Sequence, residues 1–232
     1  EGMNDEEKLG YCNYKIPIYD SLAFGLSVAQ IANQELRARA ILHRGQKLFE
    51  MDETEMAIPV FEKISGLRLL DKGLYNRVQL FELELLANRG NIPQLMEKWK
   101  GPGIEIPSYR NSLQVFFKAL QSEMEGDTAA ATRQYKWLAT ANPYLEDAVI
   151  SSSNYFKKHG KDTLMPYTIL ANALQANPFS VKLLKAYSFE VVRMGFVDYV
   201  NSALEKLRTL VPPKPLRNFL ITNQRTFDQI IQ

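Results

Sequence analysis

A repeated spacing of glycine and proline is the feature of this sequence that most constrains its fold. Four glycines, at positions 90, 126, 160 and 195, lie 36, 34 and 35 residues apart. Four prolines, at positions 107, 143, 178 and 212, lie 36, 35 and 34 residues apart, each 17 or 18 residues after its glycine. A period in the mid-thirties is typical of helical hairpins that stack in series, because each unit buries its apolar face against its neighbours.

The residues around each glycine predict a tight connection between two helices. Three Asx residues lie 16 residues before their prolines and just after a glycine, namely Asn91, Asp127 and Asp162. A glycine in the left-handed conformation can end one helix, and an Asx side chain can cap the next. One extra residue, Lys161, explains the single interval of 18. Pro166 is then expected in the first turn of its helix, where a missing N–H costs little.

Hydrophobic periodicity and helix-breaking residues predict the helix boundaries. Apolar residues at helical spacing predict helices over 20–33, 35–51 and 55–64. The steps Asn142-Pro143 and Asn177-Pro178 are expected to end helices, because a residue before proline avoids the helical conformation. Gly101-Pro102-Gly103 should end another helix early and leave 104–108 extended. Pro213 and Pro215 predict a break, followed by a final helix over 216–231.

The first two complete helices carry a pattern that resembles the tetratricopeptide repeat family. Bulky, small and large apolar residues lie at that family's intervals, namely Ile41, Gly45, Leu48, Ala57 and Phe61. In the four later units the small position falls on Leu83, Ala119, Ser153 and Ser188. The large apolar position of the second helix falls on Trp99, Tyr135, Leu170 and Leu204. Only Leu83 departs from the pattern, and a large side chain there would hold the two helices of a hairpin apart.

The repeat and the resemblance together predict an all-α fold: a right-handed α-solenoid of antiparallel helix hairpins with a C-terminal capping helix. We expect a loosely ordered N-terminal arm over 1–19 and an N-terminal flanking helix over 20–34. About five hairpins similar to tetratricopeptide repeats should follow over 35–212, and the capping helix over 213–232.

Composition excludes several classes of protein. The 28 basic and 26 acidic residues give a net charge of +2, which provides no general attraction to nucleic acid or to an anionic membrane. The single cysteine, Cys12, excludes an internal disulfide and a cysteine-rich metal cluster. The longest weakly polar run, 21–32, is too short to span a bilayer, and the first residues do not show the charged-then-apolar pattern expected of a signal peptide. These features predict a soluble protein, either cytoplasmic or bacterial periplasmic or exported.

The sequence has no residues at the spacing of an active site. His43 and His159 lie in different repeats without a partner at metal-ligand spacing. Cys12 has no neighbouring histidine or helix N-terminus that would lower the pKa of its thiol. No phosphate-binding or dinucleotide-binding glycine loop occurs. We therefore expect no catalytic residues, no metal and no cofactor, and a protein that is not an enzyme.

The resemblance implies that the first helix of each hairpin lines a concave groove. The residues that it would place there include Phe116, Glu123, Asn154, Lys157, Lys182, Lys185 and Phe189. The groove would be mostly apolar in the first three units and basic at its C-terminal end, where Lys158 and Arg193 add charge. Such a surface suits an acidic or carboxylate-bearing peptide. Helix-to-helix packing within a hairpin is the alternative role for the apolar members of this set.

Three functions remain open from the sequence. The first is a non-catalytic scaffold or adaptor that binds a partner protein or peptide through the concave face. The second is single-stranded nucleic-acid binding by an array similar to pentatricopeptide repeats, which would need a basic groove along its whole length. The third is an α-helical enzyme, or a regulatory domain of a larger enzyme or of a secretion or assembly complex. The balanced charge favours the first, with no nucleic-acid partner expected, and the oligomeric state is left open.

Overall fold

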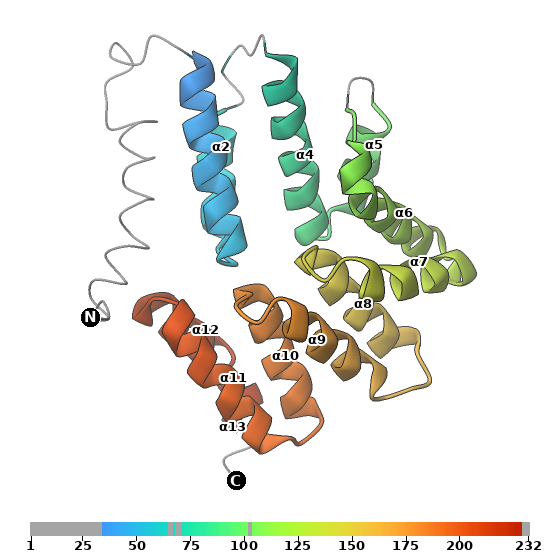
Figure 1. Cartoon of the computed structure of the whole chain (residues 1–232), viewed down its shortest axis with the longest axis vertical. Coiled ribbons are helices and arrows are strands. Elements are labelled where there is room, and N and C mark those ends of the chain that lie inside the picture. Colours follow the sequence, from blue (N-terminus) through green and yellow to red (C-terminus); the bar gives the residue numbers. More distant parts are fainter. Residues whose placement is uncertain (1–33, 65–66, 68–70, 102–103, 229–232) are drawn as a thin grey trace. The chain divides into compact units, whose positions relative to one another are not determined.

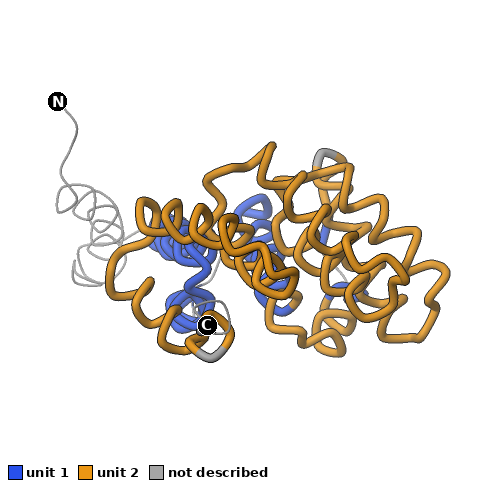
Figure 2. Tube along the Cα trace, turned by 90° about the horizontal axis from the view of Figure 1, so that it is seen from below, with its two compact units in different colours: residues 1–86, 99–105 blue, residues 87–98, 106–232 orange. Residues whose placement is uncertain are grey.

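A computed structural model of the chain describes residues 34–64, 67, 71–101 and 104–228, and every regular element in these ranges is a helix (Figure 1). The described residues form two compact units, 34–86 with 99–105 and 87–98 with 106–228, which Figure 2 colours separately. The predicted all-α class is thus confirmed for the described part of the chain. The expected arm over 1–19 and nearly all of the expected flanking helix over 20–34 lie outside it.

In the first unit, α2 (Gln34–Glu50) and α3 (Thr54–Glu62) form a helical hairpin. Their bounds agree with the predicted helices over 35–51 and 55–64. The tight connection places Asp52 in the left-handed region, with φ of 61°, which aspartate tolerates better than most residues. The backbone N–H of Glu53 donates a 2.9 Å hydrogen bond to the carbonyl of Leu48 across this turn.

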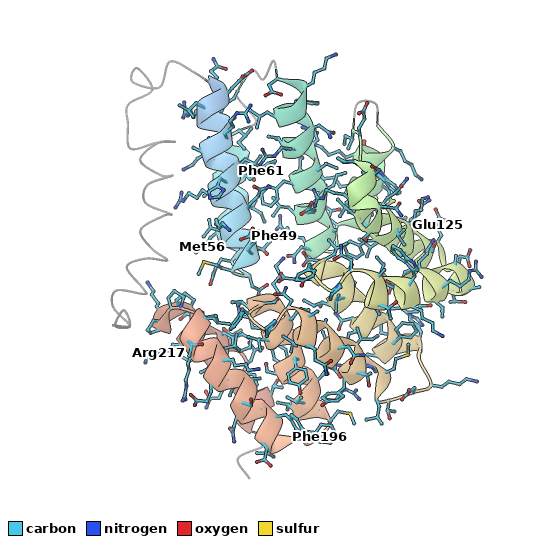
Figure 3. All side chains as sticks on the ribbon, viewed as in Figure 1. Phe49, Met56, Phe61, Glu125, Phe196 and Arg217 are labelled. Carbon is cyan, nitrogen blue, oxygen red and sulfur yellow. The ribbon has the colours of Figure 1, made fainter. Side chains whose placement is uncertain are left out.

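The core of the first unit is built around Phe81 of α4 (Lys72–Asn88). Its ring meets Phe49 and Phe61 edge to face, with centroids 5.6 and 5.4 Å apart (Figure 3). A Cβ atom at Gly45 would lie 3.2 Å from the Phe81 ring. The small residue of the repeat pattern therefore leaves room for an aromatic ring of α4, which would have to shift to accept a Cβ atom here.

The second unit contains a regular succession of helices. They are α5 (Ile92–Trp99), the 3-10 turn η2 (Ser108–Arg110), α6 (Asn111–Glu125), α7 (Thr128–Ala141), α8 (Glu146–His159), α9 (Met165–Ala176), α10 (Val181–Arg193), α11 (Val197–Leu210), α12 (Pro213–Thr222) and α13 (Gln224–Asp228). From α6 to α11 each helix packs against the next, and the pairs α7 with α9 and α8 with α10 also touch. Figure 1 shows α7 to α11 side by side in chain order.

The glycine turns agree with the prediction at three of four positions. Gly90, Gly126 and Gly195 have φ of 69°, 78° and 73°. Asp127 caps α7 by accepting a 2.9 Å hydrogen bond from the N–H of Ala130.

The prediction of a left-handed glycine and an Asx cap is wrong at the remaining turn, which contains Gly160. Gly160 is extended, with φ of −78° and ψ of 149°. Asp162 accepts a hydrogen bond from the N–H of Leu164, one residue before α9 begins at Met165. The inserted Lys161 lengthens this connection, so the chain no longer needs a left-handed residue to reverse direction.

Prolines mark helix ends as predicted, but the two near the C-terminus begin a helix. Helices α7 and α9 end directly before the Asn-Pro steps, and Pro166 lies in the first turn of α9. The predicted break lies at 211–212, between α11 and α12. The final helix begins earlier than predicted, with Pro213 and Pro215 in the first turn of α12, because proline is already set at a helical φ. The expected single helix over 216–231 is interrupted at Asn223, whose side-chain amide donates to the carbonyl of Phe219.

The small position of the repeat is buried in all five hairpins, including the hairpin in which Leu83 departs from the pattern. Gly45 and its four counterparts, Leu83, Ala119, Ser153 and Ser188, are all buried. Both serines satisfy their hydroxyls on backbone carbonyls, of Pro166 and Lys185 respectively. Of the large apolar residues of the second helices, Tyr135 and Leu170 are buried, whereas Trp99 and Leu204 are partly exposed.

Candidate functional site

The apolar residues expected to line a groove belong to the core instead. Phe116 of α6 is 2% exposed and packs beside Phe117. The resemblance places six further apolar residues from the first helices of the first three hairpins in the groove, and all of them are buried: Leu42, Phe49, Leu80, Ala87, Leu113 and Leu120. The prediction of an exposed apolar groove over these residues is therefore wrong. Each first helix buries a stripe wide enough to include these positions, as is usual for a helix with neighbours on more than one side.

Lys182 is also buried, and its charge is matched inside the protein. Its Nζ lies 2.9 and 3.1 Å from the two carboxylate oxygens of Asp147, across from α10 to α8. Asp147 accepts a further 2.7 Å hydrogen bond from the side-chain amide of Asn88. The expectation that Lys182 presents charge to a partner is therefore wrong.

A second group of ion pairs centres on the buried carboxylate of Glu190. Lys157 of α8 and Arg193 of α10 each approach it to 2.7 Å. Arg193 also donates a 2.9 Å hydrogen bond to the carbonyl of Thr163 in the α8–α9 connection. Three of the cations that made the predicted groove basic, Lys157, Lys182 and Arg193, are thus paired with carboxylates.

Glu123 at the end of α6 accepts a 2.7 Å hydrogen bond from the hydroxyl of Tyr135. Lys158 approaches the same carboxylate to 3.6 Å. Burial raises the pKa of the Tyr135 hydroxyl, and the hydrogen bond to Glu123 raises it further. Glu123 is therefore part of the packing between α6, α7 and α8. Asn154, by contrast, is exposed on α8.

Lys185 and Phe189 of α10 lie beneath the C-terminal helices. The Phe189 ring centroid is 5.7 Å from that of Phe219 in α12 and 5.6 Å from that of Phe227 in α13. The Lys185 ammonium lies 5.3 Å from the centroid of the Phe219 ring, within range of a cation–π interaction. The last helices therefore cover the part of α10 that the sequence assigned to a binding surface.

A cavity of about 490 Å³ lies elsewhere on the second unit, between α9, α10 and α11. Leu184 and Tyr187 of α10 contribute buried surface, while Tyr167 of α9 and Tyr199 of α11 contribute rings from the two flanking helices. Because α9 and α11 are the second helices of consecutive hairpins, this cavity lies outside the predicted groove, which was assigned to the first helices.

Aromatic rings define the shape of this cavity. The rings of Tyr167 and Tyr187 are 5.6 Å apart, and Phe196 meets Tyr167 edge to face at 5.5 Å. Phe196 also lies 6.0 Å from Tyr199, and Figure 3 shows it at the connection between α10 and α11. Burial raises the pKa of the Tyr187 hydroxyl, and the neighbouring hydroxyls of Tyr167 and Tyr199 add to the effect. The hydroxyl of Tyr187 is therefore a neutral hydrogen-bonding group at neutral pH.

The polar side chains at the cavity are available to a ligand. Gln175 of α9 and Ser202 and Lys206 of α11 line it, and their side chains have no hydrogen-bond or ion-pair partner within the described ranges. Lys206 is the one charged residue among the described residues of the lining. The cavity therefore combines aromatic walls with a single positive charge. The recurrence of tyrosine in two successive second helices was the sequence signal that could have indicated it.

Two exposed aromatic residues follow the Asn-Pro steps on the same unit. Tyr144 is 68% exposed and Phe179 is 74% exposed, the largest values among the large apolar side chains of the described residues. Each follows its proline in a four-residue turn closed by a hydrogen bond to the Asn carbonyl. The Tyr144 hydroxyl donates to the carbonyl of Ala176, which brings it to the end of α9. Pro178, next to Phe179, lines the cavity.

The described residues show no arrangement of a metal centre. No group of three His, Cys, Asp or Glu side chains in this part of the chain could hold a metal ion. His159 is exposed and lies 4.8 Å from the ring of Tyr155. Within the same ranges no helix is long and apolar enough to cross a membrane. Cys12 lies outside the described residues.

Comparison with known proteins returns no relative. No family model, no curated protein and no solved structure matches the chain. The class of protein is therefore defined by its structure as all-α, with each helix from α6 to α11 packed on the next. The likeness to tetratricopeptide repeats stays a prediction that rests on the residues of the repeat.

Proposed function

We propose that this protein is a non-catalytic adaptor that binds a partner protein or peptide. In this proposal the hairpins are similar to tetratricopeptide repeats and stack into a right-handed solenoid. The regular period, the buried small positions and the helix-to-helix contacts of α6 to α11 support it. Solenoids of this kind offer an extended surface for recognition rather than a deep catalytic pocket.

The exposure of Tyr144 and Phe179 is the observation that carries the proposal. Large aromatic side chains are enriched in protein interfaces, where they supply much of the binding energy. Here two of them stand on equivalent turns, next to a cavity with further tyrosines. The binding surface that we propose is therefore the face formed by these turns and by α9 and α11. The first-helix face is less suited, because three of its cations, Lys157, Lys182 and Arg193, are engaged in ion pairs.

Site-specific photo-crosslinking in cells of the source organism tests this function. A benzophenone amino acid replaces Phe179 in the full chain, and the control carries it at Met56, which is 54% exposed on the first unit. We expect a discrete crosslinked partner from position 179 that is absent from position 56. Substitution of Tyr144 by serine in the same chain should reduce the yield. The absence of a discrete product, or the same products from both positions, would overturn the proposal.

Single-stranded nucleic-acid binding is the less favoured alternative. An extended array that follows a phosphate backbone needs cations along its surface. Lys157, Lys182 and Arg193 are instead paired with carboxylates, and the net charge is +2. A filter-binding assay with single-stranded RNA at low and high salt distinguishes the two, since phosphate contacts impose a steep salt dependence.

A further inference from the structure

We infer that the cavity between α9, α10 and α11 binds a peptide segment in which an aromatic side chain lies next to a carboxylate. The inference rests on the proposed adaptor function and specifies what the partner presents. The aromatic side chain would enter between Tyr167 and Tyr199, and the carboxylate would pair with Lys206 at the edge. A carboxylate on a side chain and one at a chain terminus share this chemistry.

The dimensions and walls of the cavity suit an aromatic side chain. Its volume of about 490 Å³ falls within the range of established ligand sites. Tyr167 and Tyr199 come from opposite helices, and Phe196 lies within 5.5 and 6.0 Å of the two rings. Packing against Tyr187 and Phe196 therefore positions the Tyr167 ring before a ligand arrives, whereas Tyr199 is 53% exposed. Aromatic rings favour offset or edge-to-face contact with another ring, which selects an aromatic over an aliphatic side chain.

Charge selects an anion next to that aromatic group. Among the described lining residues Lys206 is the one charged side chain, and no carboxylate of this lining offsets it. Its neighbour at 205, a glutamate, pairs with Arg208 instead. The side chains of Gln175 and Ser202 add hydrogen-bonding groups beside it. A carboxylate gains both a charge partner and neutral donors at this edge.

The surroundings favour a peptide over an isolated small molecule. Pro178 is part of the cavity wall, and the next residue, Phe179, is 74% exposed. Tyr144 approaches the same end of α9 through its hydrogen bond to Ala176. A chain whose side chain fills the cavity would therefore pass over further apolar surface. A free small molecule would leave that surface bare.

Fluorescence anisotropy with defined peptides tests the inference on the full chain. The probe is a fluorescein-labelled, amidated peptide with Phe followed by Asp between Gly and Ser residues. One comparison peptide has Asn in place of Asp, a second has Ser in place of Phe, and a third ends in Phe with a free carboxylate. We expect the probe to bind with a Kd below about 1 mM. The Asn peptide should bind at least about threefold more weakly, as expected for an exposed ion pair.

Two variants and two matched controls locate the site. Ser202→Trp fills the cavity from an exposed position and should abolish binding, whereas Asn201→Trp places the same ring on the neighbouring exposed position of α11, outside the lining. Lys206→Glu should weaken binding at least about fivefold. Lys136→Glu makes the same charge change at an exposed position of α7 and should have no effect. Methyl resonances of Ala171 and Ala203, which line the cavity, should shift on binding.

The outcomes separate this inference from the adaptor proposal. Failure of every aromatic and acidic peptide to bind below about 1 mM, or equal binding by Ser202→Trp and Asn201→Trp, would overturn the inference. If the partner crosslinked at position 179 is retained by Ser202→Trp, the adaptor proposal stands and the cavity is not its binding site. Binding of the Ser-for-Phe peptide as tightly as the probe would also refute the role of the aromatic walls.

Discussion

Replacement of Lys182 by methionine tests whether the ion pair with Asp147 stabilises the second unit. The side chain of Lys182 is 2% exposed and that of Asp147 is 15% exposed, so the pair is almost fully desolvated. Removal of one partner of a buried ion pair costs about 3–5 kcal/mol, because the other charge is left uncompensated. Asp147 keeps its hydrogen bond from Asn88 and slight solvent contact. We therefore expect a loss near the lower limit, about 3 kcal/mol.

Urea unfolding followed by circular dichroism measures this loss in the full chain. For a chain of this size, about 3 kcal/mol corresponds to a fall in melting temperature of about 6–12 °C. Hydrogen–deuterium exchange should place the loss of protection in α8 and α10, which carry the two partners. Arg208→Met is the matched control, since its pair with Glu205 is exposed on both sides. It should change stability by less than about 0.5 kcal/mol.

A second variant distinguishes a lost ion pair from a damaged core. Lys182→Met combined with Asp147→Leu removes both charges, and such apolar replacement of a buried pair is often neutral or stabilising. The double variant should regain more than half of the stability that the single variant loses. A single variant that costs less than about 1 kcal/mol would show that the pair is not desolvated as the structure has it. A double variant no better than the single one would attribute the loss to packing.

Three further predictions concern the repeat itself. Ser188→Leu should destabilise the fold by about 1–3 kcal/mol in urea unfolding, since a large side chain is forced into a buried small position, while Ser188→Ala costs less. Gly126→Ala should cost about 1 kcal/mol because φ is 78°, and Gly126→Asn should cost less; the reverse order would refute the turn assignment. Burial raises the pKa of the Glu146 carboxyl, so its contribution to stability is present below the ordinary pKa and is lost as the pH rises through the raised one. Glu146→Gln should therefore gain stability relative to the native chain between about pH 4 and pH 7, and an unchanged difference in urea unfolding would contradict the shift.

Local chemistry made the helix boundaries predictable. Asn142-Pro143 and Asn177-Pro178 end α7 and α9 because the proline ring clashes with the N–H and Cβ of the preceding asparagine and disfavours the helical conformation there. The left-handed glycines depend on the same kind of local constraint. The prediction for the turn at Gly160 failed because the added residue, Lys161, changes how the loop closes. Neither Gly160 nor Lys161 indicates this effect when it is considered alone.

The direction in which helix residues face could not be predicted from the repeat. The repeat fixes the angle of a residue around its helix, but burial depends on how much of that circumference the neighbours cover. Helix α10 touches α8, α9, α11 and α13, so Lys182 is buried and Phe189 is covered by aromatic rings of α12 and α13. The resemblance assumed that this side of the first helices is open. It therefore assigned packing residues to a groove and overlooked the tyrosines of α9 and α11.

The salt dependence of partner binding can be predicted from the finding that the expected groove cations are paired within the protein. Had Lys157, Lys182 and Arg193 faced a partner, several ion pairs would form on binding and high salt would weaken it strongly. In the structure these cations are matched by Asp147 and Glu190, and only Lys206 remains at the cavity that we propose for binding.

One exposed ion pair contributes at most about 1 kcal/mol, which corresponds to about fivefold in affinity. We therefore expect the Phe-Asp peptide to bind less than about fivefold more weakly when NaCl rises from about 0.05 to 0.5 M. The Lys206→Glu variant should lose this salt-dependent weakening, because salt screens the repulsion that the new glutamate introduces. A much steeper dependence that survives Lys206→Glu would place the binding surface among other cations of the protein and would contradict the assignment of the cavity.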